Sequence, residues 1–193
     1  MSDRSGVHHH LQGLAQPGGA FSGVGVLVEL TVEGQVLVAP EGGTLRLLVR
    51  TPLFSMREFD FPVRDPGYLE IAESDPLIHD AAVQWIGNYI RLYEGAEALP
   101  ALELVAARIS LPSDGSFASY ETALAGVRSP PLDADVDLPP AQALLDVLFE
   151  VPIASDQSEF SIDPQVAHLG LRTVTVLSRG SWAGPPNTRI NPP

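Results

Sequence analysis

The chain has 193 residues, 45% of them hydrophobic and 18% charged, so it is long enough to bury a core and too apolar to be disordered throughout. Its 24 acidic residues outnumber 11 basic residues, all of them arginine, and the net charge of −13 argues against binding to nucleic acid or to an anionic membrane. Cysteine is absent, which excludes disulfides, thiolate metal sites and thiol nucleophiles.

The two ends of the chain carry no periodic pattern. Residues 1–20 and 179–193 are rich in Gly and Pro, and we expect a disordered lead and a disordered tail around a single β-rich domain at 21–178. The first twenty residues lack a clear signal-peptide cleavage site, and no uninterrupted apolar run reaches the length of a membrane helix. We therefore expect no membrane-spanning segment in this chain.

Most of the domain predicts β-strands. Apolar residues alternate over 24–30 and 32–38, and the turn sequence Pro-Glu-Gly-Gly at 40–43 leads into a return strand at 44–50. Further stretches with strand length and composition lie at 102–111, 144–151 and 171–177. The predicted fold class is mainly β with some helix (α+β), an antiparallel, β-sandwich-like domain.

One amphipathic helix is predicted over about 76–94. Asp75 is a suitable N-cap, Pro76 suits the first helical position, and Gly95 suits a left-handed C-cap. Apolar residues from Ile78 to Tyr93 recur every three or four positions and form a stripe that should lie across a sheet.

A short second helix is predicted over about 116–126, where Phe117, Tyr120 and Leu124 keep a similar spacing. Ser113, Asp114 and Ser116 suit the turn and cap that lead into it. The acidic, Pro-rich stretch at 129–140 predicts an exposed loop.

The histidines are the first candidates for chemistry. His8, His9 and His10 could together bind a transition metal, but a terminus without carboxylate partners offers no further ligands. His79 beside Asp80, and His168 near Asp163, could each be an acid-paired general base. We expect both to be surface histidines, because the sequence places no nucleophile beside either one.

The remaining motifs are weaker. Asp133, Asp135 and Asp137 alternate as calcium ligands do, but the central Gly and later Glu of a calcium loop are missing, which favours a solvated loop. There is no Gly-x-Ser-x-Gly elbow and no lysine, and the glycines at 23 and 25 precede a strand, so neither an activated serine nor a phosphate loop is indicated. The sequence assigns no catalytic, cofactor-binding or metal-binding residue, and we expect a protein that is not an enzyme.

The middle of the chain resembles a known family. The resemblance begins with Thr-Leu-Arg-Leu-Leu-Val-Arg-Thr-Pro-Leu at 44–53, Phe-Pro-Val-Arg-Asp-Pro-Gly-Tyr-Leu at 61–69 and Trp-Ile-Gly-Asn-Tyr-Ile-Arg-Leu-Tyr-Glu at 85–94. It continues at 108–121, 142–153 and 160–164 and covers about 30–177. These segments resemble the extracytoplasmic N-terminal domain of HupE/UreJ-type membrane proteins, the hydrogenase- and urease-accessory family associated with nickel transport.

The resemblance implies a non-catalytic accessory domain that lies outside the cytoplasmic membrane in the full-length family protein. There the domain precedes a bundle of membrane helices that carries the metal-passage residues. The sequence contains no such bundle, which either a truncated or frame-shifted gene or separate production of the soluble half would explain. Its partner would be another protein or the membrane-transporter domain, and its acidity could concentrate cations such as Ni²⁺ nearby. A free-standing β-sandwich binding or adhesion module is the alternative, and a hydrolase using His79 or His168 is a third hypothesis.

Overall fold

The computed structural model describes residues 28–30, 34–165, 169, 176–178 and 181–182. The predicted lead and nearly all of the predicted tail lie outside these residues, as do the terminal histidines and His168. The expected strand at 24–30 is described only from Val28, and the one at 171–177 only from Val176.

The largest sheet has the strand order β1-β2-β3-β9-β8, with β11 paired beside β2. Its neighbours are antiparallel except for the parallel pair β11 and β2. The strands are β1 (Val28–Leu30), β2 (Gly34–Glu41), β3 (Thr44–Pro52), β8 (Glu103–Ser110), β9 (Leu144–Pro152) and β11 (Val176–Ser178).

A second sheet has the order β12-β10-β6-β7, and a small hairpin joins β4 to β5. The strands are β4 (Val63–Arg64), β5 (Tyr68–Leu69), β6 (Ile90–Glu94), β7 (Glu97–Ala98), β10 (Glu159–Pro164) and β12 (Ser181–Trp182). The expected mainly β, α+β class with two packed sheets is therefore confirmed.

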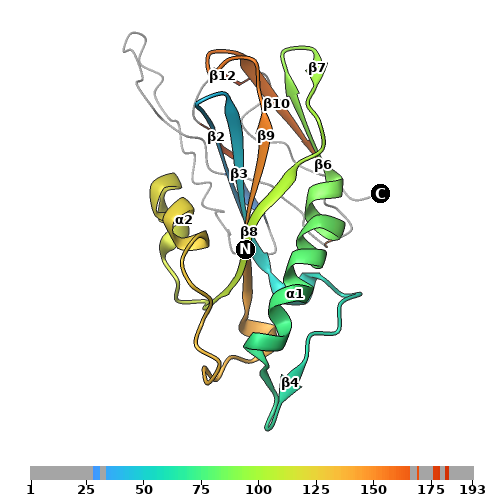
Figure 1. Ribbon diagram of the computed structural model, residues 1–193, viewed down its shortest axis with the longest axis vertical. Coiled ribbons are helices and arrows are strands. Elements are labelled where there is room, and N and C mark those ends of the chain that lie inside the picture. The colour runs from blue at the N-terminus through green and yellow to red at the C-terminus, as the bar shows by residue number, and fades with distance from the viewer. Residues whose placement is uncertain (1–27, 31–33, 166–168, 170–175, 179–180, 183–193) are drawn as a thin grey trace, which may run out of the picture.

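Both faces of the large sheet are covered, because alternate residues of its central strands point to opposite sides. On one face, apolar residues of β3 and β9 share a core with α1 (Ile71–Ala81) and with Ile90, Leu92 and Phe160 of the second sheet. On the other face, Leu48 and Leu148 pack against α2 (Tyr120–Val127). Figure 1 shows α2 on one side of the strands and α1 on the other.

The hairpin between β2 and β3 follows its sequence signal. Gly42 and Gly43 both adopt positive φ, 62° and 77°, which the tight hairpin turn requires. The Asp156 carboxylate accepts hydrogen bonds from both of their amides, at 2.9 and 3.0 Å. The β9–β10 loop therefore holds the tip of this hairpin.

The limits of the first helix differ from the prediction of 76–94. The helix begins at Ile71, so that Pro76 lies inside α1, and it continues as η2 (Ala82–Ile86) and η3 (Gly87–Tyr89). The residues that follow form β6, in which buried Ile90 and Leu92 alternate with exposed Arg91.

The predicted helix was too long because the apolar residues near position 90 fit the spacing of a helix and also that of a strand. Pairing with β10 stabilises the strand. Gly95, with φ of 60°, serves the turn between β6 and β7 and does not cap a helix. Pro76 is tolerated inside α1 because the carbonyl it leaves unpaired belongs to exposed Ala72, where water can bind.

The second helix is confirmed, as the short η4 (Ser116–Ala118) followed by α2. The hydroxyl of Ser119 accepts the Thr122 amide, and the Thr122 side chain bonds back to the Ser119 amide, forming a capping box. Both belong to a long excursion from 111 to 143, which leaves the sheet after Ser110 and returns at Leu144. Ser110 and Leu144 face each other in the β8–β9 ladder.

The connections also contain η1 (Leu53–Ser55) and η5 (Pro140–Gln142). Within the residues described, none of the helices has both the length and the apolar character needed to cross a membrane.

Candidate functional site

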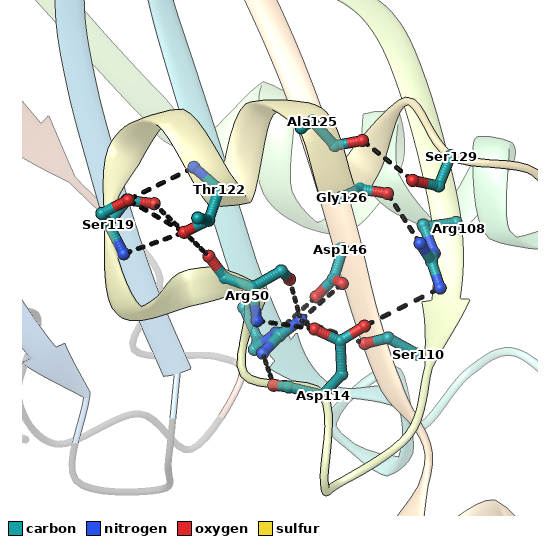
Figure 2. A network of polar contacts seen from close by, with 11 residues as sticks. Arg50, Arg108, Ser110, Asp114, Ser119, Thr122, Ala125, Gly126, Ser129 and Asp146 are labelled. Carbon is teal, nitrogen blue, oxygen red and sulfur yellow. Dashed lines mark hydrogen bonds and ion pairs between the residues drawn. The ribbon is translucent and has the colours of Figure 1, made fainter.

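The densest polar cluster lies between the large sheet and the segment that leads into α2. Arg50 of β3 and Asp146 of β9 face each other in the ladder, and both side chains are buried. Arg50 Nε and Nη2 donate to the two Asp146 carboxylate oxygens at 2.6 and 2.7 Å, a bidentate pair. Figure 2 shows this pair beneath the loop that carries Asp114.

The same guanidinium binds the loop before α2. Arg50 donates to the Asp114 carbonyl at 2.7 Å, to the Asp114 carboxylate at 3.1 Å and to the Ser116 hydroxyl at 3.0 Å. Its carbon Cζ lies 4.2 Å from the centre of the Phe117 ring, within cation–π distance. Arg108 extends the cluster, with Nη1 donating to the Gly126 carbonyl at 2.6 Å near the end of α2.

The cluster lowers the pKa of the Asp114 carboxyl group. Partial burial would raise the pKa of Asp114, but hydrogen bonds from Ser116 and Arg50 and the Arg50 charge lower it from 3.8 to about 2. For Arg50, burial opposes the charged form, yet its contacts with Asp146 and Asp114 outweigh burial and raise its pKa. Asp114 and Arg50 are therefore both charged near neutral pH.

This arrangement is suited to holding α2 on the sheet and not to binding a ligand or catalysing its reaction. Each of the three guanidinium nitrogens of Arg50 already donates to a protein acceptor and the side chain is buried, so the group is engaged in holding the loop on the sheet. We call the set of Arg50, Asp146, Asp114 and Ser116 the α2 clamp. It fixes the start of the excursion to the centre of the sheet.

Other carboxylates of the described part also serve local structure. Glu94 accepts the amides of Ala154 and Ser155, at 2.8 and 3.0 Å, and the Ser158 hydroxyl, and these bonds lower its pKa. Glu150 accepts from Arg46 at 2.8 Å on the α2 side of the sheet.

A different feature offers room for a partner. A hollow of about 200 Å³ lies between η3, β6 and the segment that enters β8. Most of its lining residues are apolar, among them Val83, Ile90, Leu99 and Leu102, although much of the exposed lining surface is polar. Among the described residues, Arg91 is the only charged one that lines it. Val83 is 39% exposed, which is high for a large apolar side chain.

The histidine and serine candidates take structural positions. His79 is half-buried, and its Nδ1 hydrogen-bonds the Asp75 carbonyl one turn back along α1. Ser113 is exposed, whereas Asp114 accepts the Ser116 amide at 2.8 Å, as expected for a turn before a helix. The second predicted pair cannot be placed, because His168 is outside the described residues.

The acidic loop is exposed as predicted. Asp133, Asp135 and Asp137 are all exposed, and Asp137 accepts a hydrogen bond from Arg64 at 3.1 Å. In the described segments, no three His, Asp or Glu side chains come together as a metal-binding group.

Sequence reasoning missed the α2 clamp and the hollow. A signal for the clamp was present, because Arg50 and Asp146 each interrupt a long apolar run with opposite charges. The hollow had no such signal, because its lining residues, which all lie between Val83 and Leu102, form no motif with a recognisable chemical role.

Comparison with known proteins adds no relative: no family model, no curated protein and no solved structure matches the chain.

Proposed function

We propose that this chain is a non-catalytic accessory domain that binds a protein partner through the surface around the hollow. The observation that carries the proposal is the hollow itself, which combines apolar side chains with polar backbone and side-chain atoms, is open at the surface and is smaller than the roughly 300–1,000 Å³ typical of small-molecule sites. It is large enough for a single bulky apolar side chain. A pocket of this size suits an anchoring residue of a protein partner.

The resemblance to HupE/UreJ-type proteins supplies the first candidate for that partner. In that family the domain precedes a membrane bundle, so we propose that the partner is the membrane-transporter part of such a protein and that the domain acts outside the cytoplasmic membrane. The free-standing binding module remains the second candidate, and it is favoured if the partner is a soluble protein.

Photo-crosslinking in the source cells tests the proposal. A benzophenone amino acid replaces Val83 at the hollow and, as a matched control, exposed Ala118 in η4 on the α2 side. We expect one discrete adduct from position 83 and none from position 118. The same adducts from both positions, or none from position 83, would contradict the proposal.

The identity of the crosslinked protein separates the two candidates. A polytopic membrane protein supports the accessory-domain assignment, and a soluble protein supports the free-standing module.

A role beside a nickel transporter adds a measurable property. The net charge of −13 should enrich Ni²⁺ near the surface. Calorimetry at low ionic strength should show uptake of Ni²⁺ that is abolished by added salt, whereas no uptake at low salt would remove this part of the proposal.

A further inference from the structure

The edge of the large sheet next to the hollow is available for pairing. In the described part of the chain, β8 pairs with β9 alone and ends the strand order. The ladder shifts register between Leu104 and Ala106, so that Val105 bulges outward with 45% of its surface exposed. Figure 1 shows β8 running between α1 and α2, and α1 contacts it.

Exposure is confined to the first half of the strand. Glu103 and Val105 are exposed and their neighbours up to Ala107 are partly exposed, whereas Ile109 and Ser110 are buried. The exposed half begins directly after Leu102, which lines the hollow. The hollow and the free edge are therefore parts of one continuous surface, which we call the β8 surface.

The charge around the β8 surface is predominantly negative. Exposed carboxylates lie close in sequence to lining residues: Asp80 is one helical turn before Val83, Glu97 is two residues before Leu99, and Glu103 follows Leu102. The opposing cation, Arg91, is held to its own backbone, because its Nη1 donates to the Asn88 and Ile90 carbonyls.

The other ion-paired arginines have their carboxylate partners away from the hollow. Arg46, Arg50 and Arg128 are bound to carboxylates on the α2 side, and Arg64 is bound to Asp137. Arg108, which follows the exposed half of β8, is bound to Asp114.

We propose that the β8 surface binds an extended, basic segment of the partner protein, which lies along β8 from Glu103 to Ala107 and places one apolar side chain in the hollow. This inference rests on the proposed protein-binding function and specifies its site and ligand chemistry. An unpaired strand edge offers backbone donors and acceptors, an adjacent pocket selects one side chain, and the flanking carboxylates select Arg or Lys. An edge strand beside a helix is a common geometry for such strand addition.

The probe for this inference is the capped heptapeptide Arg-Val-Arg-Leu-Arg-Val-Arg, whose apolar side chains share one face when it is extended. Two matched peptides accompany it. In one, glutamate replaces every arginine; in the other, proline replaces both valines, which preserves the charge and removes two backbone donors. We expect micromolar binding by fluorescence anisotropy for the first peptide and at least tenfold weaker binding for the other two.

Protein variants locate the site. Val83→Glu should weaken binding at least tenfold, whereas Phe54→Glu, at an exposed apolar residue in η1 away from the hollow, should leave it unchanged. Arg91→Gln should tighten binding a few-fold because it removes the cation that lines the hollow. Because Val83 and Phe54 are exposed, both variants should fold, and thermal melting of each variant checks this.

Hydrogen exchange reports the strand addition directly. The peptide should slow exchange of the amides in 103–107 and leave those of α2 unchanged. Equal binding of the proline peptide, an unaffected Val83→Glu variant, or unaltered exchange in 103–107 would each overturn the inference.

Failure of the inference is distinguishable from failure of the proposed function. If position 83 crosslinks to a partner in cells but the basic peptide does not bind, the domain binds a protein of different chemistry. If position 83 crosslinks to nothing, the proposed function fails as well.

Discussion

At the scale of single residues, the buried Arg50–Asp146 pair concentrates the largest electrostatic terms of the molecule. Asp146 is fully buried and the Arg50 side chain is only 6% exposed. Moving the two charges out of water costs several kcal/mol of solvation free energy per ion, and the attraction between the ions offsets about the same amount. The pair therefore contributes little net stability, and its main effect is to fix the relative position of the groups around it. The arrangement it specifies is the seating of the Asp114 loop on the sheet.

Removing one partner should therefore be far more harmful than removing both. Arg50→Met leaves Asp146 charged and buried, and we expect a loss of about 3–5 kcal/mol in the free energy of unfolding, measured by urea denaturation. The double variant R50M/D146L should recover at least half of that loss. Arg128→Gln, which breaks a pair whose arginine is 45% exposed, serves as the control and should cost less than about 1 kcal/mol.

The depressed pKa of Asp114 predicts acid sensitivity. The carboxylate has a pKa of about 2 in the folded protein and 3.8 in its ordinary state, so the unfolded chain binds the extra proton first as the pH falls. Its contribution is therefore present above pH 4 and is lost as the pH decreases toward 2. Urea unfolding between pH 5 and pH 2.5 should show this decline, and Asp114→Asn should make it shallower. An equal slope in the variant would show that other carboxylates cause it.

At the scale of elements, α2 depends on close contact with the turn that precedes it. A methyl group added at Gly126 would lie 2.7 Å from the Ser116 Cβ, closer than real Cβ atoms approach. The same methyl at Gly115 would meet nothing within 4 Å, and that residue has a φ of −86°, which any residue adopts.

These two glycines form a matched pair of variants. Gly126→Ala should destabilise the protein by about 1–3 kcal/mol because the turn or the helix must move, and Gly115→Ala should be neutral or slightly stabilising. Thermal melting of both variants measures the two changes in stability. Equal effects would mean that the excursion is loose enough to absorb the methyl group.

Some elements could be predicted from the sequence and others could not. The strands predicted at 44–50 and 144–151 are found at Thr44–Pro52 and Leu144–Pro152, since each has an apolar pattern that only a sheet buried on both faces explains. β6 was predicted as helix because Ile86, Ile90 and Tyr93 are spaced for a helix as well. Its pairing with β10, some seventy residues away, is not encoded locally.

At the scale of the whole molecule, the pH at which the net charge is zero should differ from the lower pH at which the protein unfolds. The sequence pI is about 4.6, so repulsion between molecules is weakest there, whereas the Asp114 carboxylate of the α2 clamp keeps its charge until lower pH. We expect turbidity to peak near pH 4.6 with an unchanged circular dichroism spectrum, followed by unfolding under more acidic conditions. Loss of the spectrum together with the turbidity would show that the fold itself fails at the pI.

The candidate site could not be predicted at this scale. The hollow and the β8 edge come together only when η3, β6 and the entry to β8 are packed side by side, and none of these segments carries a motif of its own. The composition predicts only a preference of charge: an excess of thirteen negative charges disfavours nucleic acid and anionic membranes and favours cations.

The excursion that carries α2 leaves and rejoins the sheet at facing residues, Ser110 and Leu144. Its two ends are thus fixed neighbours, so a change of length within its exposed part, such as 129–135, leaves the pairing of β8 with β9 in place, provided that Leu138 stays in the core and Asp114 stays bound to Arg50. Homologues could therefore differ most in this stretch while keeping the same framework. A designer could likewise graft a binding loop there without redesigning the sheets, provided that the new loop shields Leu48 and Leu148.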